Sequence, residues 1–198
     1  MSYTQANIPR ALQAKYTFDE RGHASAILKT DFPHEFDDIL FALSSFTLCR
    51  SHVVARGGGR STISQTLDGF FRSRGWTPAR FNVSITVDQN TTPFGTHEID
   101  NYKNKVGVEI EWNNKTEFYD RDLTHFRLMH DLRIISVGVI ITRKHELQAI
   151  FDQLGIGEKY GRSTTIWKHL IEKVNMGSAA GCPLLLVGIG RSCYDPNC

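Results

Sequence analysis

The chain lacks the features expected of a secreted, membrane-spanning or zinc-finger protein. Its 198 residues include only 4 cysteines, whose spacings fit no metal-finger pattern. The longest apolar runs, residues 134–142 and 182–189, are too short to cross a bilayer. No charged segment followed by an apolar stretch opens the sequence, so we expect no secretory signal, no membrane partner, a cytoplasmic location and reduced cysteines.

Length and composition predict one globular domain over residues 1–198. Hydrophobic residues make up 40% of the chain and charged residues 22%, as in ordinary soluble proteins. A chain of this length buries a substantial core. Cys49 and Cys182 adjoin apolar residues and are expected in that core. The glycine-rich segment 56–60 lacks the Lys-Ser/Thr ending of a P-loop, so we expect no nucleotide cofactor.

The net charge of +2 indicates no particular partner, but the charges are unevenly distributed. Residues 50–80 contain 6 arginines and a single acid, Asp68, whereas acids outnumber bases over residues 98–131. A nuclease needs both surfaces, because arginines neutralise phosphates and carboxylates hold metal at the scissile one. A solvated basic surface is the alternative explanation. The arginines are Arg50, Arg56, Arg60, Arg72, Arg74 and Arg80.

The segment 105–112 alternates between apolar and other residues, which is the period of a strand. One face is apolar, and the other carries Glu109 and Glu111 about 7 Å apart, with Gly107 beside them. Two partly buried carboxylates repel each other and lose hydration, so they need a cation such as a hard divalent metal. A turn or short hairpin would bring Asp100 to the same place. A solvated acidic strand face is the alternative.

Hydrophobic periodicity predicts a mixed sheet flanked by helices, of the α/β or α+β class. The segment 81–88 alternates strictly and is expected to form a half-buried strand, followed by a loop over residues 90–96. The segment 134–141 is apolar almost throughout, as a strand covered on both faces would be. Another buried strand is expected over residues 183–189. Helices are expected over residues 35–46, 61 or 64 to 74, 116 or 120 to 133, 144–154 and 163 or 164 to 174.

The order of these features resembles the core of the PD-(D/E)XK nucleases: Asp100, then Glu109-Ile110-Glu111 on a strand, then a helix and an apolar strand. The closer resemblance is to type II restriction endonucleases of the BglII/BstYI family. It extends from about Leu48 to Ile189 and includes Cys49-Arg50, Gly75-Trp76 and the strand 183–189.

That resemblance implies a restriction-endonuclease-like core, a homodimer and cleavage of double-stranded DNA with Mg²⁺, which Mn²⁺ is able to replace. It also implies a short palindromic target, centred on GATC and cut with a 5′ overhang. By position, it implies that Asp100 and Glu109 are metal ligands and that Glu111 occupies the third catalytic position, binding metal or orienting water.

The third position departs from the commonest family pattern. Glu111 stands where most members have Lys and where the BglII/BstYI members have Gln, although Glu occurs there in related BamHI-like enzymes. Family members also use one more polar group from the preceding helix. Asp68 is the candidate for that role, with a plain exposed helix acid as the alternative.

Residues that read a DNA sequence must reach base edges in the grooves. In the resembled enzymes the segment after the central strand lies in the major groove, and here it precedes an expected helix N-terminus, which favours phosphate. Capping and solubility are the alternative roles. The helix over residues 116–133 is a candidate dimer interface. The predicted DNA contacts are Lys159, Tyr160, Arg162, Ser163, Thr164, Thr165, Asn113, Asn114, Lys115, Arg56 and Arg60.

Other functions fit some of the same residues. A repair or mobile-element nuclease with this core would cut without strict sequence choice, and a non-catalytic DNA-binding module would use the acids only structurally. A glycosidase with Glu109 and Glu111 as acid and base is disfavoured, because no aromatic platform lies nearby and the arginine-rich segment would go unexplained.

Overall fold

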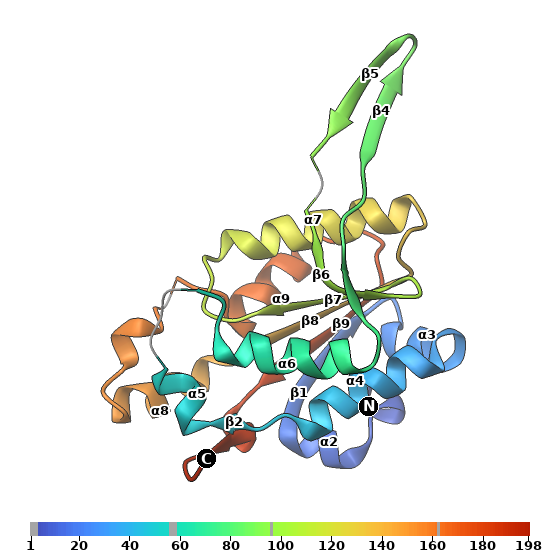
Figure 1. Cartoon of the computed structure of the whole chain (residues 1–198). Helices are drawn as coiled ribbons and strands as arrows, with labels where there is room; N and C mark the ends of the chain where they lie inside the picture. The colour runs from blue at the N-terminus through green and yellow to red at the C-terminus, as the bar shows by residue number, and fades with distance from the viewer. Residues whose placement is uncertain (1–3, 56–58, 96, 162) are drawn as a thin grey trace.

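A six-stranded mixed sheet lies at the centre of the structure, a computed structural model that describes residues 4–55, 59–95, 97–161 and 163–198 (Figure 1). The strand order is β1-β9-β8-β7-β6-β3. Strands β7, β8 and β9 are parallel, and β1, β6 and β3 are antiparallel to their neighbours. The predicted mixed α/β architecture is confirmed. The strands are β1 (Tyr16–Arg21), β3 (Thr77–Ala79), β6 (Ile99–Lys103), β7 (Val106–Glu111), β8 (Val137–Arg143) and β9 (Leu184–Ile189).

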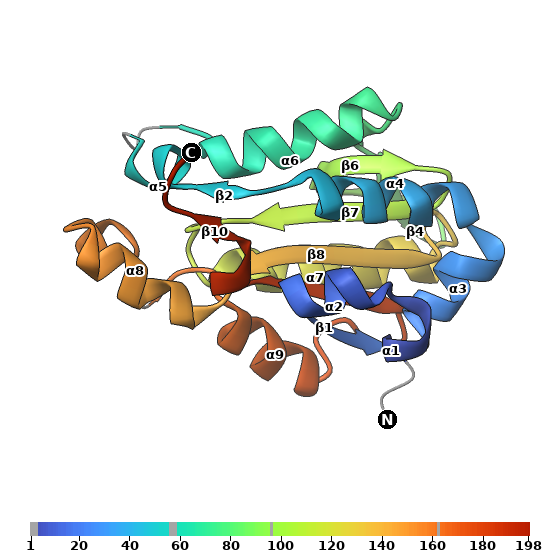
Figure 2. The same ribbon diagram turned by 90° about the horizontal axis from the view of Figure 1, so that it is seen from below.

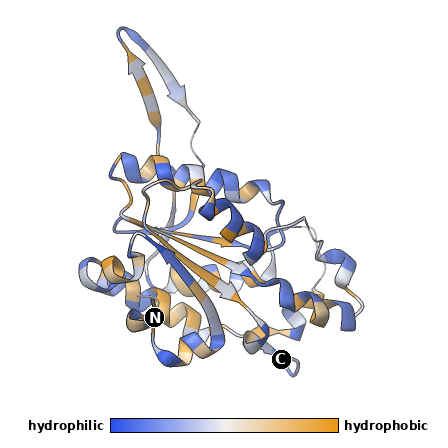
Figure 3. Cartoon of the chain, turned by 180° about the vertical axis from the view of Figure 1, so that it is seen from behind, coloured by the Kyte–Doolittle hydropathy of each residue, from blue (hydrophilic) through white to orange (hydrophobic). Residues whose placement is uncertain are grey.

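Helices cover both faces of this sheet, which explains why β8 and β9 are buried along their whole length. Helices α2, α4 and α6 lie across one face, and α7 and α9 lie across the other (Figure 2). The strands between them are largely apolar (Figure 3), and they pack with the helices into two hydrophobic cores, one on each face of the sheet. The helices are α1 (Thr4–Asn7), α2 (Arg10–Lys15), α3 (Ala24–Asp31), α4 (Pro33–Ser45), α5 (Arg50–Val54), α6 (Thr62–Ser73), α7 (Glu117–Asp131), α8 (Gln148–Gln153) and α9 (Trp167–Asn175), with short 3-10 turns at His145–Leu147, Gly157–Lys159 and Arg191–Cys193.

Two glycines allow α7 to pack closely on the sheet. Gly107 of β7 and Gly138 of β8 are register partners. A Cβ added at Gly138 would lie 2.5 Å from the ring of Phe126, and one added at Gly107 would lie 3.0 Å from it. Phe126 therefore occupies space that a larger strand residue would take. This contact sets the distance of α7 from the strands, and with it the position of the residues one helical turn earlier.

The segment 81–94 differs from its prediction. Val83–Val87 is a strand (β4), but it pairs with β5 (Asn90–Phe94), where the sequence predicts a loop, in a separate two-stranded sheet. This hairpin projects from the body of the molecule (Figure 1). Ile85 and Val87 are 49% and 65% exposed, so the strand is not half-buried. Its alternation reflects the pleat of a hairpin and not a buried face.

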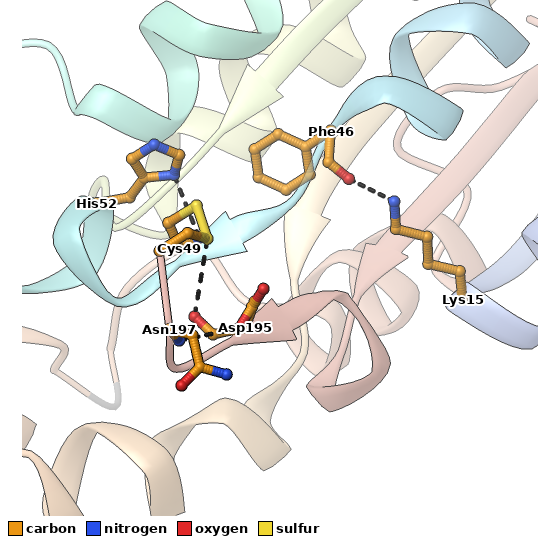
Figure 4. Close-up of a disulfide and its surroundings, with 7 residues drawn as sticks. Lys15, Phe46, Cys49, His52, Asp195 and Asn197 are labelled. Carbon is orange, nitrogen blue, oxygen red and sulfur yellow. Dashed lines mark hydrogen bonds between the residues drawn. A yellow bond between two sulfur atoms is a disulfide. The ribbon is translucent and has the colours of Figure 1, made fainter.

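The C-terminal tail is ordered and corrects the prediction that all four cysteines are reduced. Strand β10 (Tyr194–Asp195) pairs in parallel with β2 (Leu48–Cys49), and the N–H of Ser51 donates to the carbonyl of Cys198 at 3.2 Å. This pairing brings Cys198 to Cys49, which is only partly buried, and the two form a disulfide (Figure 4). Cys182 and Cys193 are free and buried, as predicted for Cys182.

Most predicted helices are confirmed, with one shift that matters for the DNA-binding hypothesis. Helix α9 begins at Trp167 after the N-cap Ile166, not after Ser163 or Thr164. The Thr164 hydroxyl instead donates to the carbonyl of Gly161 at 2.8 Å, within the preceding turn. Across the described ranges, no helix combines the length and the apolar character needed to cross a membrane.

Candidate active site

Glu109 and Glu111 point from β7 toward α7. Val106, Val108 and Ile110 of the same strand belong to the core on the opposite face, which confirms the predicted alternation. Glu109 is 1% exposed and Glu111 is 2% exposed. Buried carboxylates on one strand face lose hydration and repel each other, so the surrounding groups decide their charge state.

A tight hairpin brings Asp100 beside this pair, as the sequence predicts. Strands β6 and β7 are antiparallel, and the turn between them contains Asn104 and Lys105, which have positive φ angles of 42° and 68°. The backbone N–H of Asp100 donates to Glu109 Oε2 at 3.4 Å. The Asp100 side chain is 29% exposed, so it is the most accessible of these three carboxylates.

Asp122 of α7 is a fourth carboxylate in the site, and sequence reasoning missed it. It is fully buried, and its side chain shares a hydrogen bond with Glu111. A hydrogen bond between two carboxyl groups requires a proton on one of them. The available signal was its position in the inward-facing helical stripe, which includes Tyr119, Leu123 and Phe126.

One cluster of potential metal ligands among the described residues combines predicted and unpredicted residues. Ligand atoms of His97, Glu109 and Asp122 all lie within 4.8 Å of one another. Of these three residues, only Glu109 belongs to the predicted ligand set of Asp100, Glu109 and Glu111. Burial and the nearby Arg121 lower the pKa of His97 to about 4, so its imidazole is neutral at pH 7 and has a free lone pair.

Burial is the largest cause of the raised pKa values in the site, and neighbouring carboxylates raise them further. The pKa of Glu111 rises from 4.5 to about 9, through burial and the charge of Asp122. The pKa of Glu109 is raised well above its ordinary value by burial, Asp122 and Asp100. Burial also raises the pKa values of Asp100 and Asp122, against the opposing effect of nearby arginines.

These groups fit a divalent cation. Glu109 Oε1 and Asp122 Oδ2 are buried and have no hydrogen-bond partner within the described part of the chain. A buried carboxylate oxygen without a donor is energetically costly unless a cation or proton neutralises it. Carboxylate oxygens are the ligands that hard divalent ions prefer, and a neutral imidazole also suits a transition-metal ion such as Mn²⁺.

Arg121 lies at the edge of the carboxylate cluster. Its Nη2 is 2.9 Å from Asp122 Oδ1 and 3.6 Å from Glu111 Oε1, and its side chain is 36% exposed. Glu111 Oε2 also accepts a hydrogen bond from Asn114 Nδ2 at 2.7 Å. A partly exposed guanidinium beside buried acids is able to contact both the site and a bound phosphate.

Asp68 is linked to the cluster through an arginine. Arg60 Nη2 lies 2.6 Å from Asp68 Oδ2 and 3.2 Å from Asp100 Oδ2. Asp68 is 1% exposed and accepts a hydrogen bond from Asn101 Nδ2 at 2.8 Å, so it is not the exposed helix acid of the alternative. It holds Arg60 against Asp100 and is not part of the cluster formed by His97, Glu109 and Asp122.

A pocket of about 510 Å³ opens onto the site. Predicted DNA-contact residues line it together with the catalytic candidates, so the fold brings the two groups into one cavity. Arg56 and Arg162 lie outside the described residues. The lining includes Arg60, His97, Asp100, Glu111, Asn113, Asn114, Arg121, Lys159 and Tyr160.

Several of the predicted DNA contacts already bind groups of the protein itself, and three of them do so most closely. Lys159 Nζ and the hydroxyl of Tyr160 both donate to the carbonyl of Val53 in α5, at 3.1 Å and 2.9 Å. Tyr160 is 2% exposed. Thr165 is fully buried, and its hydroxyl accepts from the N–H of Asn114 at 3.1 Å. These residues hold the segment in place.

The remaining predicted contacts lie closer to solvent. Lys115 and Ser163 are exposed, and Asn113 and Thr164 are partly exposed. Lys115 and Thr164 form an isolated β-bridge, which joins the turn after β7 to the segment before α9. The two predicted DNA-binding segments therefore form one continuous surface beside the carboxylates.

A known protein family matches most of this chain, including the site. The family model for restriction endonuclease BglII/BglIII matches residues 16–189. That range contains all six strands of the central sheet and all four clustered carboxylates. No curated protein matches the chain.

Proposed function

Because this chain belongs to the BglII/BglIII family of restriction endonucleases, we propose that it cuts double-stranded DNA at a short palindromic site with Mg²⁺ as its metal. Membership makes it a type II restriction endonuclease that hydrolyses DNA. The observation that carries the metal proposal is the cluster of buried carboxylates with unpartnered oxygens, Glu109 Oε1 and Asp122 Oδ2.

We assign Asp100, Glu109 and Asp122 to holding the metal, with His97 at its edge. Bound there, a divalent ion supplies a Lewis acid and lowers the pKa of a coordinated water. Metal binding requires the clustered carboxyl groups to lose their shared protons, so binding releases protons and strengthens as pH rises.

Glu111 is proposed to take the proton of the attacking water. Its carboxylate stands beside Asp122, and Asn114 Nδ2 fixes its orientation at 2.7 Å. A base whose pKa lies above that of an ordinary glutamate accepts a proton more readily once it has been ionised. Mn²⁺ is expected to replace Mg²⁺, because the neutral imidazole of His97 is a ligand that Mn²⁺ tolerates.

Arg60 and Arg121 are proposed to neutralise the phosphates of the bound strand. Both guanidinium groups reach the pocket, and both are more than a third exposed. Asp68 then acts through Arg60, as a positioning residue that holds the guanidinium beside Asp100. Asp68 is therefore proposed to act electrostatically and not to contact the reacting groups, because its carboxylate is already bound by Asn101 and Arg60.

Sequence reading is proposed to come from the exposed part of the surface formed by Lys115, Ser163 and Thr164. Asn113, whose Nδ2 donates to the carbonyl of Lys159 at 2.9 Å, supports this surface together with Asn114 and Thr165. A two-fold palindrome, which we propose is GATC-centred and cut to leave a 5′ overhang, requires two copies of this surface. Helix α7 buries its apolar stripe within the chain. A homodimer through α7 would therefore use the outer face of the helix.

Plasmid digestion tests the proposal. Wild-type protein with Mg²⁺ should give discrete fragments, and sequencing their ends gives the site. Glu109→Gln and Asp100→Asn should lower the cleavage rate by at least about 10³-fold, whereas both variants should bind the mapped site in Ca²⁺. Asp37→Asn, at an exposed position of α4, is the matched control and should cut normally.

A smear without discrete bands would show that the enzyme cuts without strict sequence choice. That result would refute site-specific cleavage and favour the nonspecific nuclease. Equal loss of DNA binding in both variants would remove the metal assignment. Unchanged cleavage by Glu109→Gln would refute the site as a whole.

A further inference from the structure

A second pocket, of about 340 Å³, lies at the C-terminal end of β8, between α8 and the start of α9. Its lining contains basic residues and no acid within the described part of the chain. The carboxylate site does not share these residues. The side chains that matter are Arg143, His145, Gln148, Lys168 and His169.

Arg143 is a buried cation without an acidic partner. It is 1% exposed, and no described carboxylate lies within ion-pair distance of it. Its Nη2 donates to the carbonyl of Gly161 at 3.2 Å and to Thr164 Oγ1 at 2.8 Å, whereas its Nε has no partner among the described residues. Burial lowers its pKa to about 10, so it stays charged at neutral pH.

Helix α9 adds a second source of positive potential. It has 9 residues, its N-cap Ile166 supplies no side-chain hydrogen bond, and its first turn contains no acid. The first N–H groups of such a helix favour an anion. Lys168 stands in that first turn with its side chain 67% exposed and its Nζ 3.8 Å from the exposed carboxylate of Glu172, and His169 lies beside it.

We propose that this pocket binds a phosphate group of the DNA backbone, separate from the phosphate that is cleaved. A buried guanidinium with a free Nε, an open helix N-terminus and a surface lysine together provide charge and donors for one phosphate. The identification of this phosphate as part of DNA rests on the proposed function. The ability of the pocket to bind a phosphate does not.

Position favours DNA over a free phosphate. Arg143 directly follows Thr142, which is the register partner of Glu111, so the pocket lies at the same edge of the sheet as the carboxylates. The same guanidinium holds Gly161 and Thr164, in the segment proposed to read the sequence. A phosphate bound here would fix that segment on the duplex, because phosphate contacts set the register of base contacts.

Inorganic phosphate tests the chemistry without DNA. Phosphate should raise the melting temperature of the full chain in a saturable manner at constant ionic strength. Lys168→Gln should weaken that response severalfold, and Arg143→Met should abolish it. Lys29→Gln, at an exposed position of α3, should respond as wild type does. Because Arg143 is buried, Lys168→Gln carries the test if Arg143→Met fails to fold.

Single methylphosphonate substitutions test the source. In a duplex spanning the cut site mapped by plasmid digestion, with Ca²⁺ present, one neutral linkage in each half-site should weaken wild-type binding about tenfold and leave Lys168→Gln almost unaffected. Lys168→Gln should also reduce the salt slope of log K by about 1 per half-site.

The outcomes separate the claims. If phosphate raises the melting temperature but no methylphosphonate linkage affects wild type more than Lys168→Gln, the pocket binds a free phosphate. That result would overturn the DNA assignment. Absence of both effects would overturn the proposal entirely. Failure of plasmid cleavage alongside a normal phosphate response would count against the proposed function and leave the pocket chemistry standing.

Discussion

Raising the pH should destabilise the metal-free protein, and Glu111→Gln should remove much of that effect. In the unfolded chain Glu111 ionises near its ordinary pKa of 4.5, whereas in the fold it keeps its proton up to about 9. Between these values the folded state binds more protons than the unfolded state. The contribution of Glu111 to the stability of the fold is therefore greatest below about pH 4.5, and it falls as the pH rises toward about 9.

The size of the effect follows from the same shift. Each pH unit in this window costs about 1.4 kcal/mol for one such group. At pH 8 Glu111 alone would lower the free energy of unfolding by about 5 kcal/mol relative to acidic pH, which is a large part of the roughly 5–15 kcal/mol typical of a domain. In the Glu111→Gln variant the new amide would resemble the protonated carboxyl, because an amide both accepts a hydrogen bond, here from Asn114, and donates one, here to Asp122.

Urea unfolding in a chelator at pH 5, 6.5 and 8 measures the prediction. The free energy of unfolding of the wild-type protein should fall by several kcal/mol from pH 5 to pH 8. That of Glu111→Gln should fall much less, and Asp37→Asn should behave as wild type does. Adding Mg²⁺ should restore wild-type stability mainly at pH 8, because the ion replaces protons that are no longer freely available there. A flat wild-type series, or equal slopes for wild type and Glu111→Gln, would refute the electrostatic description of the site.

Other contacts in the fold give three more predictions. Asp122→Asn should lower cleavage at least about 100-fold while raising the stability of the metal-free protein at pH 8, as measured by plasmid digestion and urea unfolding; unchanged cleavage would remove it from the metal site. Reducing the Cys49–Cys198 disulfide, whose cysteines are 149 residues apart, should lower the free energy of unfolding by up to about 5 kcal/mol, and Cys49→Ser should abolish the response to dithiothreitol. Gly138→Ala should cost about 1–3 kcal/mol in urea unfolding, because its Cβ meets Phe126; an unchanged midpoint would contradict the packing argument.

The sequence was most informative where local pattern and chemistry coincided. Alternation over 105–112 predicted both the strand and the two faces, because a strand with one apolar face has one register that buries it. Asp100, nine residues before Glu109, predicted a turn or a short hairpin at this point, and the structure has a hairpin that joins β6 to β7. Helices α4 and α6 also followed from spacing, and the structure selects Ser61 over Ser64 as the N-cap of α6.

Contacts between distant segments were not accessible in the same way. Asp122 enters the site because Phe126 packs against two glycines on neighbouring strands, and no local pattern contains that contact. The disulfide depends on the pairing of β10 with β2, two segments far apart in the sequence. The prediction of a half-buried strand over residues 81–88 was wrong because a strand in a projecting hairpin has the same alternating period as a half-buried strand.

The charge at the site explains why its supporting structure is so apolar. Four carboxyl groups gather at one end of β7, and the pKa values of all four are raised, so the metal-free site opposes folding at neutral pH. The buried strands β8 and β9 and the contact of Phe126 with Gly138 offset that opposition and hold α7 in place. A cation bound by the same carboxylates would then convert a destabilising cluster into a stabilising one, so metal binding and folding stability must be coupled through these residues.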